Sequence, residues 1–242
     1  YWPLSRLSLV LEKLGVNVNI YISKDYSTMV DAMKSKKVDF AFLTVVPFVE
    51  AEKKVGIKVL LKKVWESGNY FGALVVPADS KIKSITDLKD KRVGFVDEKS
   101  ASGRIYPLAM LKKRKINTDK FFKEIKFFGQ HENVMKALVK GDIDVAAVYA
   151  NDAKAKTGAW TRFTPEAKVK VLWVSQAIPN DPFCVRNEFY EKYPKLTHDL
   201  MFTLIDYRDQ PNEKNLLKRL SIDSVDLATS RQYDSVRETV GL

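Results

Sequence analysis

Two serines, an alanine and a glycine separate two apolar runs near the middle of the chain, in the order Ser100-Ala101-Ser102-Gly103. Arg92 to Val96 before them predicts a short buried strand, and Ile105 to Leu111 after them predicts a helix. The first N–H groups of a helix lack intrahelical acceptors and carry partial positive charge, so an oxyanion can bind there and serine hydroxyls can add donors. A plain helix cap is the alternative interpretation.

The chain also contains an internal repeat of a helix, a polar turn and a strand. Residues 26–41 align without a gap with residues 131–146, so that Tyr26 matches His131 and Asp39 matches Asp144. Both Tyr26 and His131 can donate a hydrogen bond to an oxyanion. The repeat predicts two lobes built in the same way. A chance likeness between two ordinary helix–turn–strand units, and a purely structural role for His131, are the alternatives.

Asp181 lies in the proline-bearing segment Ile178 to Pro182. A carboxylate repels a bound oxyanion unless the ligand carries a proton that it can donate. Phosphate monoanion, phosphite and phosphonate keep a P–OH near neutral pH, whereas sulfate does not, so Asp181 would select protonated phosphorus oxyanions. A simple turn before Pro182 is the alternative.

Strand and helix patterns alternate along most of the chain, which predicts α/β layers with a mostly parallel sheet. The segments Val75 to Asp79 and Ile178 to Pro182 have the character of hinge strands, with ordinary surface loops as the alternative. Two lobes joined in this way would enclose a cleft beyond the strand ends. The pattern predicts a helix at Tyr26 to Lys34 and strands at Val16 to Ile22, Val38 to Leu43, Ile57 to Val64 and Tyr70 to Val76.

Composition narrows the class of protein. The 242 residues carry a net charge of +11, but the lysines are scattered, as in Lys62-Lys63, which indicates a solvated surface rather than a nucleic-acid interface. One cysteine allows no internal disulfide, and two histidines fit no zinc pattern, so we expect no metal and no cofactor. No P-loop, G-x-S-x-G or G-x-G-x-x-G motif is present in the sequence, so we expect that the protein is not an enzyme. The start at Tyr1 without an initiator Met predicts a mature or trimmed segment.

Together these residues resemble the phosphate/phosphite/phosphonate-binding proteins of ABC transporters. The motifs are S-x-S-G followed by Pro107, G-x-H at Gly129 to His131, and I-P-x-D-P at Ile178 to Pro182. The resemblance implies the type II periplasmic-binding-protein fold, with two lobes and a hinge of two crossover strands. Residues 1–77 and 183–242 would form lobe 1, and residues 78–182 would form lobe 2.

The resemblance also implies a ligand shell with no catalytic residue. Asn151 stands where aminoalkylphosphonate binders carry Glu, which argues for a small ligand, although the adjacent Asp152 leaves this open. Ala101 replaces the Thr of many relatives, so it would contribute only its N–H. Thr44 and Asn151 would line a pocket for the tail of the ligand. The implied shell consists of Tyr26 and Tyr70 from lobe 1, then Ser100, Ala101, Ser102, Gly103 and His131 from lobe 2, and Asp181 at the hinge.

The expected function is that of an extracytoplasmic solute-binding protein. It would close on phosphate, phosphite or an alkylphosphonate and deliver it to the permease of an ABC transporter. It would work in the periplasm or outside the cell, with or without a lipid anchor. A sensor domain of a membrane signalling protein with the same pocket is the alternative, and nucleic acid is not an expected partner.

Overall fold

The computed structural model describes residues 15–23, 25–65, 68–206 and 222–242. The chain forms two compact units: unit 1 is Tyr1–Gly68 with Asn180–Asp234, and unit 2 is Asn69–Pro179 with Ser235–Leu242. The chain therefore passes between the units three times, whereas the sequence led us to expect two crossovers. The borders of the units also lie earlier than the expected ones after residues 77 and 182, because residues 69–77 form one continuous strand of the unit 2 sheet.

Unit 1 is built on a four-stranded sheet in which every neighbouring pair is antiparallel. Helix α8 covers this sheet, because Leu200 and Leu204 of α8 belong to the same buried cluster as Leu61 and Val185 of the strands. The strand order is β1 (Phe40–Phe42), β9 (Pro182–Arg186), β2 (Ile57–Val64) and β10 (Ser224–Leu227). The helices are α2 (Tyr26–Lys34), α3 (Val45–Ala51), the π-helix η1 (Glu52–Gly56), α7 (Asn187–Lys192), α8 (Pro194–Asp206) and the 3-10 helix η6 (Ser230–Tyr233).

Unit 2 is built on a mixed sheet, in which β4 is parallel to both β5 and β6 and the remaining pairs are antiparallel. The order is β5 (Glu124–Phe127), β4 (Arg92–Phe95), β6 (Val145–Ala150), β3 (Asn69–Pro77) and β7 (Val169–Val174), with β8 (Ile178–Pro179) also paired to β3. The helices are η2 (Thr86–Leu88), the π-helix η3 (Ala101–Ile105), α4 (Tyr106–Lys113), η4 (Thr118–Lys120), α5 (His131–Lys140), α6 (Ala159–Phe163) and α10 (Asp234–Val240).

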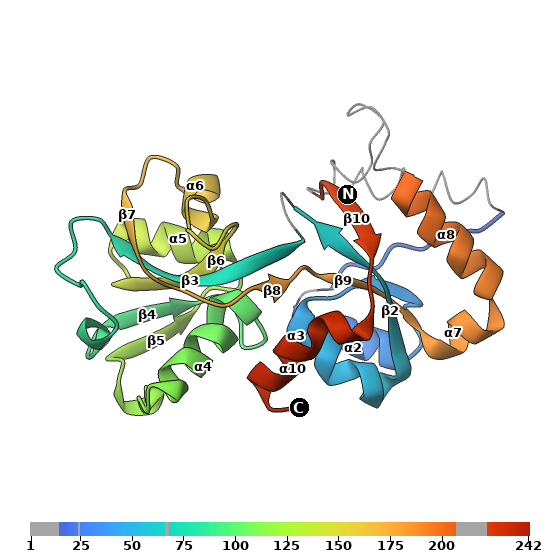
Figure 1. Cartoon of the computed structure of the whole chain (residues 1–242), viewed down its shortest axis with the longest axis horizontal. Coiled ribbons are helices and arrows are strands. Elements are labelled where there is room, and N and C mark those ends of the chain that lie inside the picture. Colours follow the sequence, from blue (N-terminus) through green and yellow to red (C-terminus); the bar gives the residue numbers. More distant parts are fainter. Residues whose placement is uncertain (1–14, 24, 66–67, 207–221) are drawn as a thin grey trace. The chain divides into compact units, whose positions relative to one another are not determined.

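Helices cover both faces of the unit 2 sheet, with α4 on one face and α5 and α6 on the other (Figure 1). Alternate residues of β6 show how the sequence achieves this. Val145 and Ala147 pack with Leu111 of α4, whereas Ala146 and Val148 pack with helix α5. Because a strand buried on both faces has no polar side, β6 is apolar at nearly every position.

Most of the expected elements are confirmed. Helix α2 begins and ends where the sequence predicts, as does strand β2, and strands β1 and β3 agree to within a few residues. Two expectations are wrong. Residues Val16 to Ile22 form no strand, and Ile20, Tyr21 and Ile22 are exposed. The sheets are also not mostly parallel, because an apolar run specifies a buried strand without specifying its direction.

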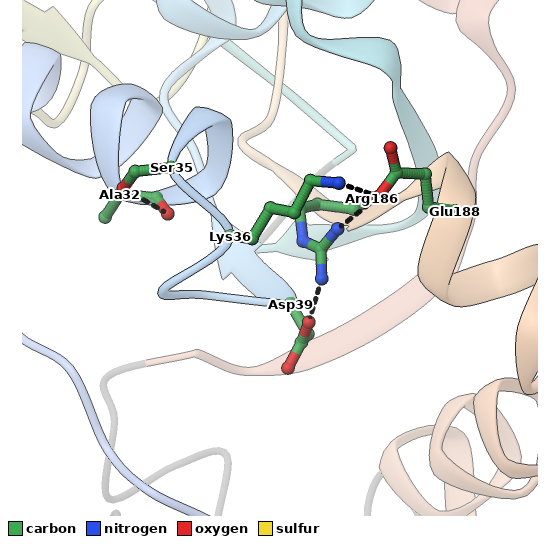
Figure 2. A network of polar contacts seen from close by, with 6 residues as sticks. All are labelled: Ala32, Ser35, Lys36, Asp39, Arg186 and Glu188. Atoms are coloured by element: carbon green, nitrogen blue, oxygen red, sulfur yellow. Dashed lines mark hydrogen bonds and ion pairs between the residues drawn. The ribbon is translucent and has the colours of Figure 1, made fainter.

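The internal repeat is a structural one. Lys36 and Gly141 hold equivalent turn positions after α2 and α5, and both have a left-handed backbone, with φ of 62° and 78°. The aspartate that precedes the next strand pairs with an arginine in both copies: Asp39 with Arg186, and Asp144 with Arg92. In unit 1 the pair lies in a larger network, in which Lys36 and Arg186 both contact Glu188 (Figure 2).

Among the described residues, no helix combines the length and the apolar character needed to cross a membrane.

Candidate functional site

Two helix starts lie side by side in unit 2. Strands β4 and β5 are parallel neighbours, so their carboxyl ends lie at the same edge of the sheet. Each strand leads into a helix there, β4 into η3 and α4, and β5 into α5. Backbone hydrogen bonds join the two connections, from Phe128 N to Phe95 O (3.0 Å) and from Gly129 N to Val96 O (2.7 Å). This is the edge of an α/β sheet at which ligands usually bind.

The serine-rich turn begins as a capped helix. Ser100 is the N-cap of η3, and its Oγ accepts a hydrogen bond from Gly103 N (3.1 Å). Ser100, Ala101 and Ser102 are all buried. The first turn is a π-helix that continues into α4, a rare form that is frequent at functional sites. The cap accounts for Ser100 but not for a second buried serine, and the N–H groups of Ala101 and Ser102 have no intrahelical acceptor.

Two glycines allow the backbone to pack closely around this turn. A Cβ on Gly103 would overlap the Val96 side chain and lie 2.8 Å from Ser100 Oγ, so close approach rather than backbone conformation requires glycine there. A Cβ on Gly72 of strand β3 would lie 3.1 Å from Ser102 O. Tyr70 is two residues before Gly72 on the same face of β3. The structure places Tyr70 in unit 2, whereas the sequence led us to expect it in lobe 1.

His131 is the first residue of α5, at the second helix start. Its ring meets the ring of Tyr149 edge to face, with centroids 4.9 Å apart. Tyr149 is in turn the cross-strand partner of Gly72. Within the described part of the chain, the buried Nδ1 of His131 has no hydrogen-bond partner. Burial lowers the pKa of His131 to about 4, so the imidazole is neutral and presents one N–H donor.

Unit 1 contributes a second cluster of predicted residues, where β1 ends and β9 begins. Leu43 N donates to Pro182 O (3.0 Å) at this junction, and Thr44 is the next residue along the chain. Thr44 is the N-cap of α3, and its buried Oγ1 has no partner among the described residues. Asp181 forms an ion pair with Lys63 Nζ at 3.2 Å. Burial raises the pKa of Asp181, and the adjacent Lys63 opposes that rise.

The two remaining predicted residues lie at the start of α2 and in the loop that follows β6. Tyr26 is partly buried at the start of α2, where Asp25 Oδ1 caps the helix by accepting from Thr28 N (2.7 Å). The Asn151 side chain donates to Thr157 Oγ1 (3.1 Å), inside the loop that follows β6. The Asp152 carboxylate accepts from backbone N–H groups of the same loop, so its role there is structural.

Sequence reasoning missed three residues: Lys63, Gly72 and Tyr149. Lys63 was expected on a solvated surface, but only 18% of its side chain is exposed. Its register in β2, two residues after the buried Leu61, was the available signal. No group of three or more His, Cys, Asp or Glu side chains in the described ranges is placed to hold a metal ion.

Two α/β units joined by several crossovers, with adjacent helix starts at a strand edge, are typical of type II periplasmic binding proteins. The structure of PhnD1 from Prochlorococcus marinus in complex with methylphosphonate has the same fold, with a TM-score of 0.79 at 19% identity over 98% of this chain and 90% of that chain. The family model of periplasmic phosphonate substrate-binding proteins of ABC transporters matches residues 7–233. The chain belongs to this family.

Two curated relatives show how far the likeness extends. The chain is 30% identical to the phosphonates-binding periplasmic protein of Escherichia coli over 86% of this chain and 62% of that protein. It is 27% identical to the phosphate-import protein PhnD of Mycolicibacterium smegmatis over 77% of this chain and 61% of that protein. The chain thus spans about three fifths of the length of both relatives.

Proposed function

We propose that this chain is a solute-binding component of an ABC transporter that binds a small phosphorus oxyanion, namely phosphate, phosphite or an alkylphosphonate. The observation that carries the proposal is the pair of adjacent helix starts in unit 2. The buried serines and the first N–H groups of the first start, and the neutral His131 of the second, supply hydrogen-bond donors at positive helix ends. The proposed role is binding alone, without a chemical reaction of the ligand.

Unit 1 would contribute Tyr26 as a donor and Asp181 as an acceptor. A buried carboxylate at an anion site favours a ligand that keeps a P–OH, because a fully deprotonated oxyanion would face an uncompensated like charge. This favours phosphorus oxyanions over sulfate. Binding would shift an equilibrium between open and closed forms, and a membrane permease would recognise the closed form.

The ligand would be small. Asn151 carries no charge to hold an ammonium group, its amide is engaged with Thr157, and the Asp152 carboxylate is occupied by its own loop. Thr44, with a buried hydroxyl, would border the substituent on phosphorus. We propose an extracytoplasmic location, as for the curated periplasmic relative.

A calorimetric titration with methylphosphonate tests this function. We expect the unaltered chain to bind, and Ser102→Ala to lose roughly tenfold or more in affinity, because a hydrogen bond to a charged group is removed. Ser35→Ala is the matched control: Ser35 is an exposed serine at the end of α2, and this variant should bind within about twofold of the unaltered chain. Equal affinity of all three proteins would place the ligand elsewhere, and no binding by the unaltered chain would refute the function.

A further inference from the structure

In unit 1, Asp181 forms an ion pair with Lys63, a residue that has no role in the proposed function so far. Two contacts join these residues across strands β2 and β9: the ion pair at 3.2 Å and a backbone hydrogen bond from Lys63 N to Asp181 O (2.9 Å). Only 18% of the Lys63 side chain and 15% of the Asp181 side chain are exposed. Both charges are therefore largely removed from water, which is costly unless each charge compensates the other.

Aromatic rings fix the position of the ammonium group. Lys63 Nζ lies 5.0 Å from the centroid of the Phe42 ring and 5.2 Å from that of Trp65. Both distances are within the range of cation–π attraction. A lysine held between two rings and a carboxylate differs from a flexible surface lysine, because its charge stays at one place beside Asp181.

The ion pair occupies one of the two Asp181 oxygens, Oδ2. An ionised carboxylate can accept further hydrogen bonds on its second oxygen. Tyr233 and Cys184 are buried titratable groups of this region, and burial raises the pKa of both, so both stay neutral. Of the groups that act on Asp181, Lys63 is therefore the one that favours its ionised form.

We propose that Lys63 determines the specificity of the site by keeping Asp181 ionised and oriented, so that Asp181 accepts a hydrogen bond from the P–OH of a singly protonated phosphorus oxyanion. Lys63 acts through Asp181 and is a positioning residue. The inference rests on the proposed function and adds a selectivity mechanism to it. Without Lys63, the isolated buried carboxylate would take up a proton and become a donor, and the site would then lose its preference for a ligand with a P–OH.

A pair of ligands of equal charge isolates this effect. At a mildly acidic pH, methylphosphonate is a monoanion with one P–OH, and methanesulfonate is a monoanion of similar shape without a proton. Any general attraction of a lysine for anions acts on both equally. The ratio of the two affinities therefore reports on the acceptor at Asp181 alone.

We expect Lys63→Met to lower the ratio of methylphosphonate to methanesulfonate affinity roughly tenfold or more. Lys62→Met is the matched control, because it removes the same charge from the neighbouring position of β2 and should leave the ratio unchanged. Asp181→Asn should lower the ratio as well. The double variant Lys63→Met with Asp181→Asn should have the ratio of Asp181→Asn, because Lys63 has no carboxylate left to act on.

The outcomes separate the inference from the function. If the unaltered chain binds neither methylphosphonate nor phosphite, the proposed function fails. If it binds them and Lys63→Met keeps the original ratio, the role of Lys63 is refuted. Should Lys63→Met fail to fold, the double variant, which buries no unpaired charge, is compared with Asp181→Asn, and a ratio that differs by tenfold between them would overturn the inference.

Discussion

His131 shows at the scale of a single residue how burial prepares a neutral donor. The ring lies against Tyr149 at the start of α5, and no described carboxylate or carbonyl pairs with its buried Nδ1. Burial without a counter-charge disfavours the imidazolium, which is why the pKa of His131 falls to about 4. A neutral imidazole keeps its N–H available over the whole neutral range of pH.

The lowered pKa of His131 predicts a pH-dependent stability in the absence of ligand. As the pH falls below 6.5, His131 of the unfolded chain binds a proton, whereas His131 of the folded chain binds one only near pH 4. Stability is therefore lost across this window, by up to about 3 kcal/mol. His131→Gln should lose less stability than the unaltered chain when unfolding free energies are measured in urea from neutral pH to pH 4.

His198→Gln, which alters the exposed second histidine, is the control for this measurement and should follow the unaltered chain. A parallel loss of stability in His131→Gln and the unaltered chain would show that His131 does not resist protonation.

The starts of helices could be predicted from sequence, but ion pairs between residues far apart in the sequence could not. The serine-rich turn and His131 were predicted because caps, glycines and apolar runs are local signals. Lys63 and Asp181 are 118 residues apart in sequence, and they meet only because β2 and β9 are neighbours in the sheet. The dipeptide Lys62-Lys63 does not show which residue its lysines would pair with, and the structure shows Lys63 against two aromatic rings and Asp181.

At the scale of elements, the two copies of the repeat form the same turn with different residues. A left-handed residue follows each helix in the turn, and an aspartate three residues later pairs with an arginine. Gly141 adopts the left-handed conformation without steric cost, whereas Lys36 adopts it with a Cβ. The repeat therefore depends on the backbone path and on the Asp–Arg pair, and glycine is used in only one of the two copies.

Opposite substitutions at these equivalent positions should have opposite effects. Gly141→Ala should lower the free energy of unfolding by about 1–2 kcal/mol, because it places a Cβ in the left-handed region. Lys36→Gly should raise it by up to about 1 kcal/mol, since relieved strain outweighs the added chain entropy of glycine and the loss of an exposed pair with Glu188. Denaturant titrations measure both, and shifts of the same sign would contradict this account of the repeat.

Element type was more predictable than element direction. Alternation and apolar runs located α2, β2 and β3, but they did not specify the antiparallel pairing of β9 with β1 and β2, or of β10 with β2. The segment Val16 to Ile22 has the alternation of a strand and yet forms none, because a pattern of side chains cannot supply a pairing partner.

At the scale of the whole molecule, the net charge of +11 is consistent with a protein that gathers small anions. Several of its cations have local roles in the described residues: Arg92 and Arg186 hold the repeat aspartates, and Lys63 holds Asp181. We propose instead that uncharged donors at the two helix starts bind the oxyanion, because directional hydrogen bonds select a ligand in a way that net charge alone does not.

The most direct test of this assignment is thermal unfolding of the ligand-freed chain with phosphate, phosphite, methylphosphonate or sulfate. A phosphorus oxyanion at about 100 to 1,000 times its dissociation constant should add about 3–4 kcal/mol of stability, and sulfate should add far less. Gly103→Ala, which crowds the serine-rich turn, should abolish the response. A chain that responds to no phosphorus oxyanion, or that responds equally to sulfate, would contradict the central claim.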